Sequence, residues 1–458
     1  MMNSNERDIS DILHQVSNLD GINPDVLWKV TRRSLSMGLP PSRFANGFQI
    51  GLTKVLSRVT NELIELNELA EFEHGIVRFA EGDYSGGKTL LCNCISEIAD
   101  QMGFATVTID LIPGGASLDR LDRIYPHVAR NIKFADATGL DQVILRAVAL
   151  KFAPETEDPK QIDLKTLDPD EVRKVRAWIR ETKSSCEVES RGFMMAALGL
   201  VESQIDVPEK TMKESLLGNE EKAEICRSIL RGEQVSPLAA SNAGVRERFS
   251  KETSRSYLRS LCQFLFRAKL TRGTLFCFDE ARRMPQNKRA VLDVCNNLQS
   301  LIDETSCGRL PATFYMFSFL SDFFEEIVVR YPALQQRISQ HARIKPSDEI
   351  SMDALLDGMA EKYAKIFYAA NPSCRKAPFK KAKPFFVKNV PIVADTTGFT
   401  RLMGATLVAF FDEVRMGAVS DDVENQTLMS FIKKEEGKLK QREKSEAERS
   451  ETEPFQTV

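Results

Sequence analysis

The chain has 458 residues, of which 42% are hydrophobic and 28% charged, and its formal net charge is −3. This length gives room for about two to three domain-sized units. The nearly balanced charge excludes a global basic field that would attract nucleic acid. Nine cysteines without a CxxC pair, and only four histidines, argue against a zinc site and for a reducing compartment.

The first part of the chain reads as helical and leads into the first strand. We expect helices in an N-terminal segment, 1–46, and a long amphipathic helix within 48–71. Residues 48–71 precede the first predicted strand, so they are placed either to flank a bound base or simply to pack. The N-terminus lacks an apolar signal core and no run approaches 18 apolar residues, so we expect a cytoplasmic protein that does not enter a membrane.

The most informative motif is GDYSGGKT, 82–89, between a predicted buried strand at 74–81 and a predicted helix at 88–102. It fits the phosphate-binding loop, in which glycines let backbone N–H groups point at phosphates in front of a helix N-terminus. Lys88 would reach the β- and γ-phosphates of ATP, and Thr89 would place its hydroxyl on Mg²⁺. The residues predicted to contact the nucleotide here are Gly82, Asp83, Tyr84, Ser85, Gly86, Gly87, Lys88, Thr89 and Leu90.

A second strand is predicted at 104–112, followed by a turn and helix at 113–132. The next strong strand begins only at 274, so residues of about 135–270 form a largely helical insertion. A polar, Pro- and acid-rich stretch at 154–172 predicts a loop or helix boundary.

The apolar run TLFCFDE, 274–280, predicts a buried parallel strand that ends in two acids. Asp279 would join Thr89 in holding Mg²⁺, and Glu280 would act as the base that polarises an attacking water. Together with the loop, these acids predict an ATPase with a catalytic glutamate beside the Walker B aspartate.

The rest of the chain predicts two more strands and a helical C-terminal region. The predicted elements are a helix at 287–305, a strand at 310–320, a helix at 321–340 broken at Pro332, a short strand at 342–348, helices at 350–370 and 397–417, a basic loop at 375–384 and a charged tail at 421–458. The tail is low in apolar residues, so we expect a frayed helix or disorder there.

This order of parts resembles that of AAA+ ATPases of the Orc/Cdc6 branch. The resemblance implies an α/β fold, a parallel sheet flanked by helices, with the segments 1–46, 47–347 (P-loop core), 348–418 (helical lid) and 419–458 (tail). It also implies a γ-phosphate sensor at Ser318 or Ser321, although the usual Thr or Asn is absent. Arg337 would reach a neighbouring subunit's ATP and Arg401 would contact the nucleotide from the lid; each has the alternative of an ordinary ion-paired surface residue.

The motifs together resemble a narrower family, the BrxD-like ATP-binding proteins of BREX-type antiphage systems, from about 33 to 417. The resemblance rests on RRSLSMGLPP, IVRFAEGDYSGGKTLL, IDLIPGG with LDRIYPHVARNI, SILRGEQVSPLAASNAGV, the Asp-Glu strand and FLSDFFEEIVVRYPALQQRI. The loop reads Ser85-Gly86-Gly87 where the family tends to have an earlier glycine, and Phe319 replaces an expected glycine. The resemblance implies an ATP-driven component, beside partners such as a helicase or methyltransferase, in this or a related defence system.

Two functions from different classes remain open at this stage. The first is an active ATPase that self-associates or assembles on double-stranded DNA and remodels a defence complex. The second is a nucleotide-dependent switch or scaffold with little turnover. For DNA, the basic segment 375–384 is one candidate surface, with a solvated loop as its alternative, and the insertion is another. A metabolite kinase would need an arginine-rich lid close behind the loop, and none is evident.

Overall fold

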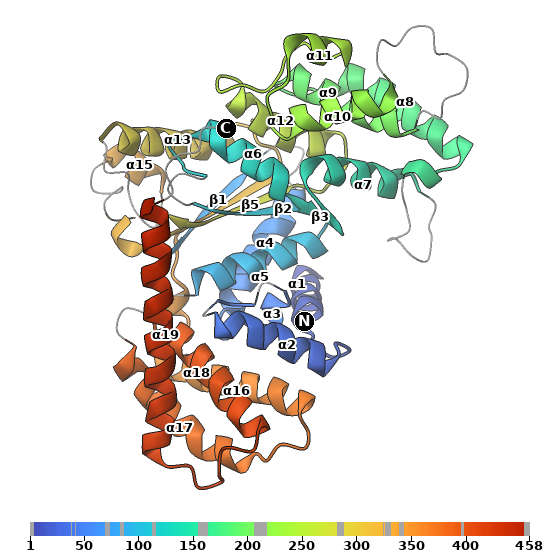
Figure 1. Ribbon diagram of the computed structural model, residues 1–458. Helices are drawn as coiled ribbons and strands as arrows, with labels where there is room; N and C mark the ends of the chain where they lie inside the picture. Colours follow the sequence, from blue (N-terminus) through green and yellow to red (C-terminus); the bar gives the residue numbers. More distant parts are fainter. Residues whose placement is uncertain are drawn as a thin grey trace.

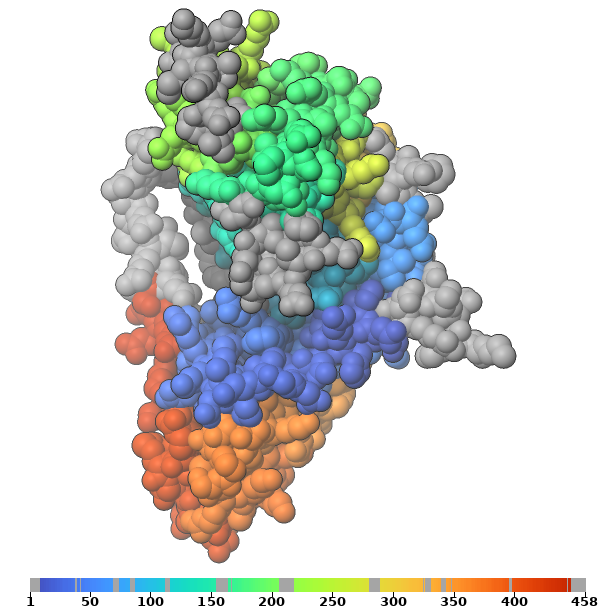
Figure 2. All heavy atoms as spheres, turned by 90° about the vertical axis from the view of Figure 1, so that its right-hand side faces the viewer, coloured from blue at the N-terminus to red at the C-terminus, as the bar shows by residue number. Residues whose placement is uncertain are grey.

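The computed structural model (Figure 1) consists of a central sheet with a helical insertion at one end and a helical lid at the other. Figure 2 shows the same division, with the N-terminal helices between sheet and lid. The structure describes residues 4–37, 39–41, 43–68, 74–82, 87–111, 116–153, 164–205, 218–281, 288–323, 325, 331–338, 343–394 and 398–452. Among the helices described, none combines the length and apolarity needed to span a bilayer.

The sheet has seven strands in the order β4-β3-β2-β5-β6-β1-β7. Strands β2, β5, β6, β1 and β7 are parallel, and the hairpin β3-β4 adds an antiparallel edge. The five strands predicted from apolar runs are all present, whereas the two-residue strands of the hairpin are too short to leave a pattern. The strands are β1 (Ile76–Glu81), β2 (Ala105–Asp110), β3 (Lys133–Phe134), β4 (Ala137–Thr138), β5 (Thr274–Ala281), β6 (Thr313–Phe319) and β7 (Arg343–Ile344).

Aromatic side chains cover one face of the central strands because they occupy alternate positions. Phe276 stacks on Tyr315 at 4.9 Å between ring centroids, and Phe278 stacks on Phe317 at 4.9 Å. Phe79 of β1 continues the row, 5.5 Å from Phe317. The neighbouring strands are thus locked in register by buried cross-strand pairs, and their carboxyl ends share one edge of the sheet.

The opposite face of the sheet is covered by α5 and α4, which share a buried apolar core with Cys277, Phe314 and Met316. The short helix α3 lies against α5, where the Glu97 carboxylate accepts hydrogen bonds from the backbone of Ala45 and Asn46. The helices here are α1 (Ser4–Ser17), α3 (Ala45–Phe48), α4 (Thr53–Glu68) and α5 (Lys88–Gln101).

The region inserted between β2 and β5 is helical, as expected, and packs on the aromatic face of the sheet. A buried ion network fastens it to the core, because Arg255 and Arg259 both donate to the carboxylate of Glu304. Its elements are α6 (Leu121–Asn131), α7 (Leu140–Phe152), the 3-10 turn Leu164–Thr166, α8 (Pro169–Ser185), α9 (Arg191–Ile205), α10 (Asn219–Leu230), α11 (Pro237–Asn242) and α12 (Ser254–Arg267). The helix α13 (Lys288–Ser306), which carries Glu304, follows β5 in the core.

The lid includes an N-terminal helix as well as the C-terminal ones. Trp28 of α2 (Pro24–Ser36) makes edge contacts with Phe367 and Phe411, whose rings stack at 4.6 Å. The helices α1 and α2 therefore join different cores, α1 beside the sheet and α2 within the lid. The remaining helices are α15 (Pro332–Arg337) in the core and α16 (Met352–Ala370), α17 (Ala377–Val393), α18 (Phe399–Arg415) and α19 (Asn425–Thr452) in the lid.

Two expectations for the C-terminal region differ from the structure. Residues 377–384, expected as a basic loop, begin α17. Pro378 lies in the first turn, where a missing N–H costs nothing, and Phe379 and Phe386 are buried. The segment expected as a flexible tail forms α19, in which Leu428 and Ile432 are fully buried against the lid. The domain boundaries drawn from the sequence remain predictions.

Candidate functional site

The loop between β1 and α5 meets the sheet at its carboxyl edge. Gly87 caps α5 at φ 82°, a conformation in which glycine is favoured, and no side chain caps the helix there. The first N–H groups of α5 therefore point toward the loop, as an anion site requires. The Lys88 ammonium is almost buried and donates to the carbonyl of Gly82 at 2.9 Å.

The structure describes both ends of the predicted loop but not its middle. Thr89 and Leu90 follow Lys88 in the first turn of α5, and both are half-buried. The predicted contacts Asp83, Tyr84, Ser85 and Gly86 lie outside the described residues.

The predicted Walker B acids lie at a bulge in β5. The register moves from Phe278 opposite Phe317 to Ala281 opposite Phe319, so β5 has one residue more than β6 across Asp279 and Glu280. Bulges of this kind re-aim side chains beside active sites. Asp279 is 2% exposed, and the side chain of Glu280 is not among those that the structure describes.

A second aspartate lies beside Asp279. In the β2–β5 register Asp110 is opposite Asp279, so two carboxylates end neighbouring strands at the same edge. Asp110 was not predicted as a site residue, although it ends an apolar strand much as Asp279 does. Because Mg²⁺ binds with one or two carboxylates, waters and substrate phosphates, Thr89 and Asp279 fit its needs. Among the described residues no group of three or more metal-binding side chains occurs.

The helix α5 and strand β5 are held together by small side chains. Cys92 lies one turn after Lys88, and Cys277 lies two residues before Asp279; both are fully buried. The Cys277 thiol lies 3.8 Å from the Cys92 carbonyl and 3.6 Å from the Ser96 hydroxyl. The hydrogen bond to Cys277 and burial raise the pKa of Cys92, so the Cys92 thiol is a neutral packing group between the helix that carries Lys88 and the strand that carries Asp279.

Ser318, one of the two sensor candidates, ends the central strand β6 between β1 and β5. It pairs in register with Ala80, two residues before Gly82. Its side chain is fully buried, and its hydroxyl finds no hydrogen-bond partner among the described residues. Such a group is rare in a native interior. Ser321, the other candidate, follows the strand and is half-buried.

A buried glutamate immediately precedes the loop. Glu81 is 5% exposed, and one of its oxygens finds no hydrogen-bond partner among the described residues. Its neighbours across β7 are cations, with the Lys345 ammonium at 3.3 Å and the Arg343 guanidinium at 3.8 Å. Pro346 lies close to Gly87, 3.8 Å from where a Cβ would be. Glu81, Arg343 and Lys345 thus form one ion cluster between the phosphate loop and the segment that leads into the lid. The sequence alone did not indicate this cluster.

The two predicted arginines lie in different parts of the molecule. Arg337 ends α15, where its Nε donates to Asp303 of α13 at 2.6 Å and its Nη1 to the Ala333 carbonyl at 3.0 Å. It remains 35% exposed. Arg401 lies in the first turn of α18 in the lid and is half-buried. Their roles toward a nucleotide stay predictions.

Three of the five cations of the predicted DNA segment 375–384 form ion pairs within the lid. Arg375 pairs with Asp421 at 2.9 Å, and Lys383 lies between Asp357 and Glu361 at 2.8 and 2.6 Å. Lys381 lies 3.5 Å from Asp422. These pairs help to attach α17 to its neighbours, and a role of the segment in DNA binding stays a prediction.

Comparison with known proteins gives one match. A family model described as BREX system ATP-binding protein BrxC/D matches residues 30–354, which include the loop, both β5 acids and Arg337. No curated protein and no solved structure shows significant similarity to the chain.

Proposed function

Since the chain belongs to the family of BREX system ATP-binding proteins BrxC/D, we propose that it hydrolyses ATP in an AAA+-type site between β1, β5 and the lid. The observation that carries the proposal is the meeting of Lys88 and Asp279 at one edge of the sheet, although the insertion separates them in sequence. Ligands of open α/β sheets bind outside the carboxyl ends of the strands.

In this proposal each residue has a stated task. The N–H groups at the start of α5 and the Lys88 ammonium bind the β- and γ-phosphates. Thr89 and Asp279 hold Mg²⁺, which when bound neutralises phosphate charge. Glu280 orients and deprotonates the attacking water.

Three further residues complete the proposed site. The unpartnered Ser318 hydroxyl offers a hydrogen bond to the γ-phosphate or to the water. Arg401 would contact the nucleotide from the lid, and Arg337 would stabilise transition-state charge on a neighbouring subunit's ATP.

The order of the strands supports an AAA+-type arrangement. The strand β6 lies between the loop-bearing strand β1 and the acid-bearing strand β5, so one strand separates the phosphate loop from the acids. The lid follows β7 directly, so that its position depends on residues next to the loop.

We propose that turnover is coupled to self-association and to assembly of a DNA-associated defence complex with other proteins of the system. A nucleotide-dependent switch with little turnover is the second candidate. The ion pair of Arg337 with Asp303 favours it, because this pair must open before the arginine can serve a neighbour.

Turnover measurements separate the two candidates. Phosphate release is measured with and without duplex DNA and partner proteins, for the wild type and for Glu280→Gln. Hydrolysis that Glu280→Gln abolishes supports the ATPase. If neither protein exceeds background under any partner condition, the switch is the better description.

A further inference from the structure

Two short segments carry a positive charge that the chain as a whole does not have. Residues 120–133 contain four Lys or Arg and one acid, and residues 433–444 contain six Lys or Arg and three acids. The net charge of the entire chain is −3. The first segment spans α6 and the start of β3, and the second lies in the middle of α19.

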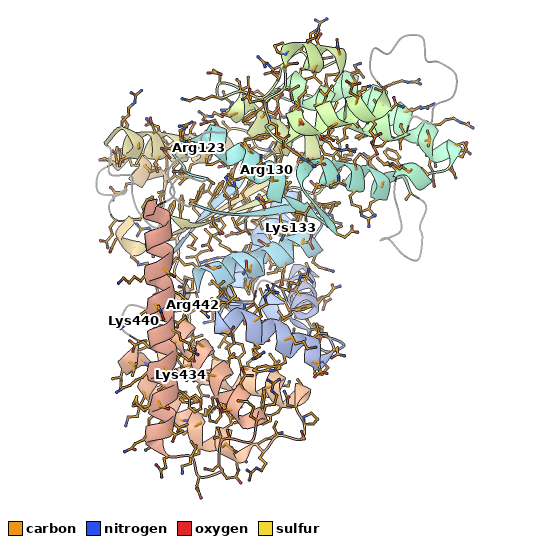
Figure 3. The ribbon with its side chains drawn as sticks, in the orientation of Figure 1. Arg123, Arg130, Lys133, Lys434, Lys440 and Arg442 are labelled. Carbon is orange, nitrogen blue, oxygen red and sulfur yellow. The ribbon has the colours of Figure 1, made fainter. Side chains whose placement is uncertain are left out.

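These segments, far apart in sequence, lie on the same side of the molecule. Figure 3 shows Arg123, Arg130 and Lys133 along α6 and β3, above Lys434, Lys440 and Arg442 along α19. In Figure 2 α19 is seen in profile at the left, below the insertion. We call these six residues the two-walled basic face.

Five of the six cations of the basic face are exposed, and Arg123 is half-buried. Arg130 is 59% exposed, and its nearest acid, Glu233, is 3.9 Å away. Lys440 is 43% exposed and pairs with Glu436 one turn earlier at 2.8 Å. Pairs of this kind contribute about 0–1 kcal/mol and yield to a stronger anion. Lys133 and Lys434 are exposed.

Arg442 is held in place by a hydrogen bond that uses one of its guanidinium nitrogens. One guanidinium nitrogen donates to the Ser36 carbonyl at 2.7 Å, which ties α19 to α2. Among the described residues this guanidinium has no second partner, so its remaining donors are available to an anion, since arginine carries five N–H groups in all. By contrast, Lys383 in α17 lies between two carboxylates.

The types of side chain that are exposed indicate which class of partner this face binds. None of the large hydrophobic side chains that are exposed in the described part of the chain is aromatic. Single-stranded nucleic acid is bound by stacking bases on aromatic rings, and protein interfaces need an apolar or aromatic centre. Duplex DNA needs neither, because its phosphates alone supply most of non-specific affinity.

We propose that the two-walled basic face binds the phosphate backbone of duplex DNA, without sequence preference. This proposal rests on the proposed association with DNA and names the surface that would bind it. DNA binding at this face does not require ATP hydrolysis. Five phosphate contacts, one for each exposed cation, predict a slope of about −4.5 for log K against log salt concentration.

The test measures binding of the full-length protein to a random-sequence duplex by fluorescence anisotropy at several salt concentrations. One variant carries Arg130→Glu and Lys133→Glu, and a second carries Lys434→Glu and Lys440→Glu. The matched control carries Arg375→Glu and Lys381→Glu, the same charge change just before and within α17. ATP binding of each variant reports that it is folded, and Gln replacements serve where a Glu variant does not fold.

Each basic-face variant should lose about 60-fold in duplex affinity near 0.1 M salt, and its slope should fall in magnitude by about 2, because two counterions fewer are released. The control should change affinity by less than about 3-fold. Absence of duplex binding at low salt, an equal loss in the control, tighter binding of single strands, or binding of poly-glutamate in place of DNA would each overturn the proposal. Duplex binding with no ATPase activity would sustain it and refute only the proposed hydrolysis.

Discussion

The ion cluster before the phosphate loop leads to the sharpest prediction. Replacing Lys345 by Met removes the nearest cation of Glu81, which lies 3.3 Å away. Among the described residues, the cation that the carboxylate then keeps is Arg343, at 3.8 Å. Glu81 is buried and adjoins Gly82, whose carbonyl holds the Lys88 ammonium. ATP phosphates would therefore approach a buried negative charge that is less well compensated.

The magnitude follows from the exposure of the two partners. Breaking a fully buried pair costs about 3–5 kcal/mol, whereas an exposed pair contributes about 0–1 kcal/mol. The Glu81 side chain is 6% exposed and that of Lys345 is 43% exposed. An intermediate cost of about 1–2 kcal/mol follows for the pair. If the uncompensated charge repels the phosphates by the same amount, ATP binding weakens by about 5- to 30-fold, which is the upper bound of the expected effect.

Titration calorimetry with a non-hydrolysable ATP analogue measures this loss. The double variant Glu81→Gln/Lys345→Met should recover most of the affinity, because the uncompensated charge is gone. Lys381→Met is a matched control, since Lys381 is 46% exposed and 3.5 Å from Asp422 but lies in the lid. An unchanged affinity in Lys345→Met, or a double variant no better than the single one, would show that the cluster does not act on the loop.

Three other predictions concern the loop, the arginine and the last helix. Lys88→Ala should lower ATP affinity by at least about 10-fold, since a charge-assisted contact is lost; unchanged binding in calorimetry would count against the loop assignment. Arg337→Ala should reduce turnover only in the oligomer, and Asp303→Ala, which frees the arginine, should not reduce it; steady-state rates measured across a dilution series test both. Truncation after residue 424 removes the buried Leu428, Ile432 and Leu439, about 5–9 kcal/mol of apolar burial, so urea denaturation should show an unstable lid, whereas truncation after 445 should have no such effect.

The strands and the two ends of the site were predictable because each has a local signal. The runs at 74–81 and 274–280 are apolar, end in acids and are bounded by turn residues, and the glycines and lysine of the loop are close in sequence. These features depend on residues that are close in sequence, so they can be predicted from a single sequence.

The lid helices show where local signals fail. Two prolines and a high charge at 375–384 suggested a loop, yet Phe379, Phe386 and Val390 pack in the lid core. This burial offsets the backbone hydrogen bonds lost at Pro384 and Pro391. In α19 the overall low apolar content concealed a buried stripe at Leu428, Ile432 and Leu439. The period of that stripe was visible in the sequence.

Contacts across the sheet could not be predicted at all. The pairing of Glu81 with Lys345 requires β7 to lie beside β1, and the position of Asp110 opposite Asp279 requires β2 to lie beside β5. Both depend on strand order, which residues distant in sequence determine together.

The most direct test of the central claim is a single-turnover experiment with protein in excess over labelled ATP and Mg²⁺. Wild-type protein should convert bound ATP to ADP and phosphate, and Glu280→Gln should bind ATP with similar affinity and retain it unhydrolysed. Equal conversion by both proteins would show that Glu280 is not the base. No conversion by the wild type, with ATP bound and with DNA and partner proteins present, would contradict the ATPase itself.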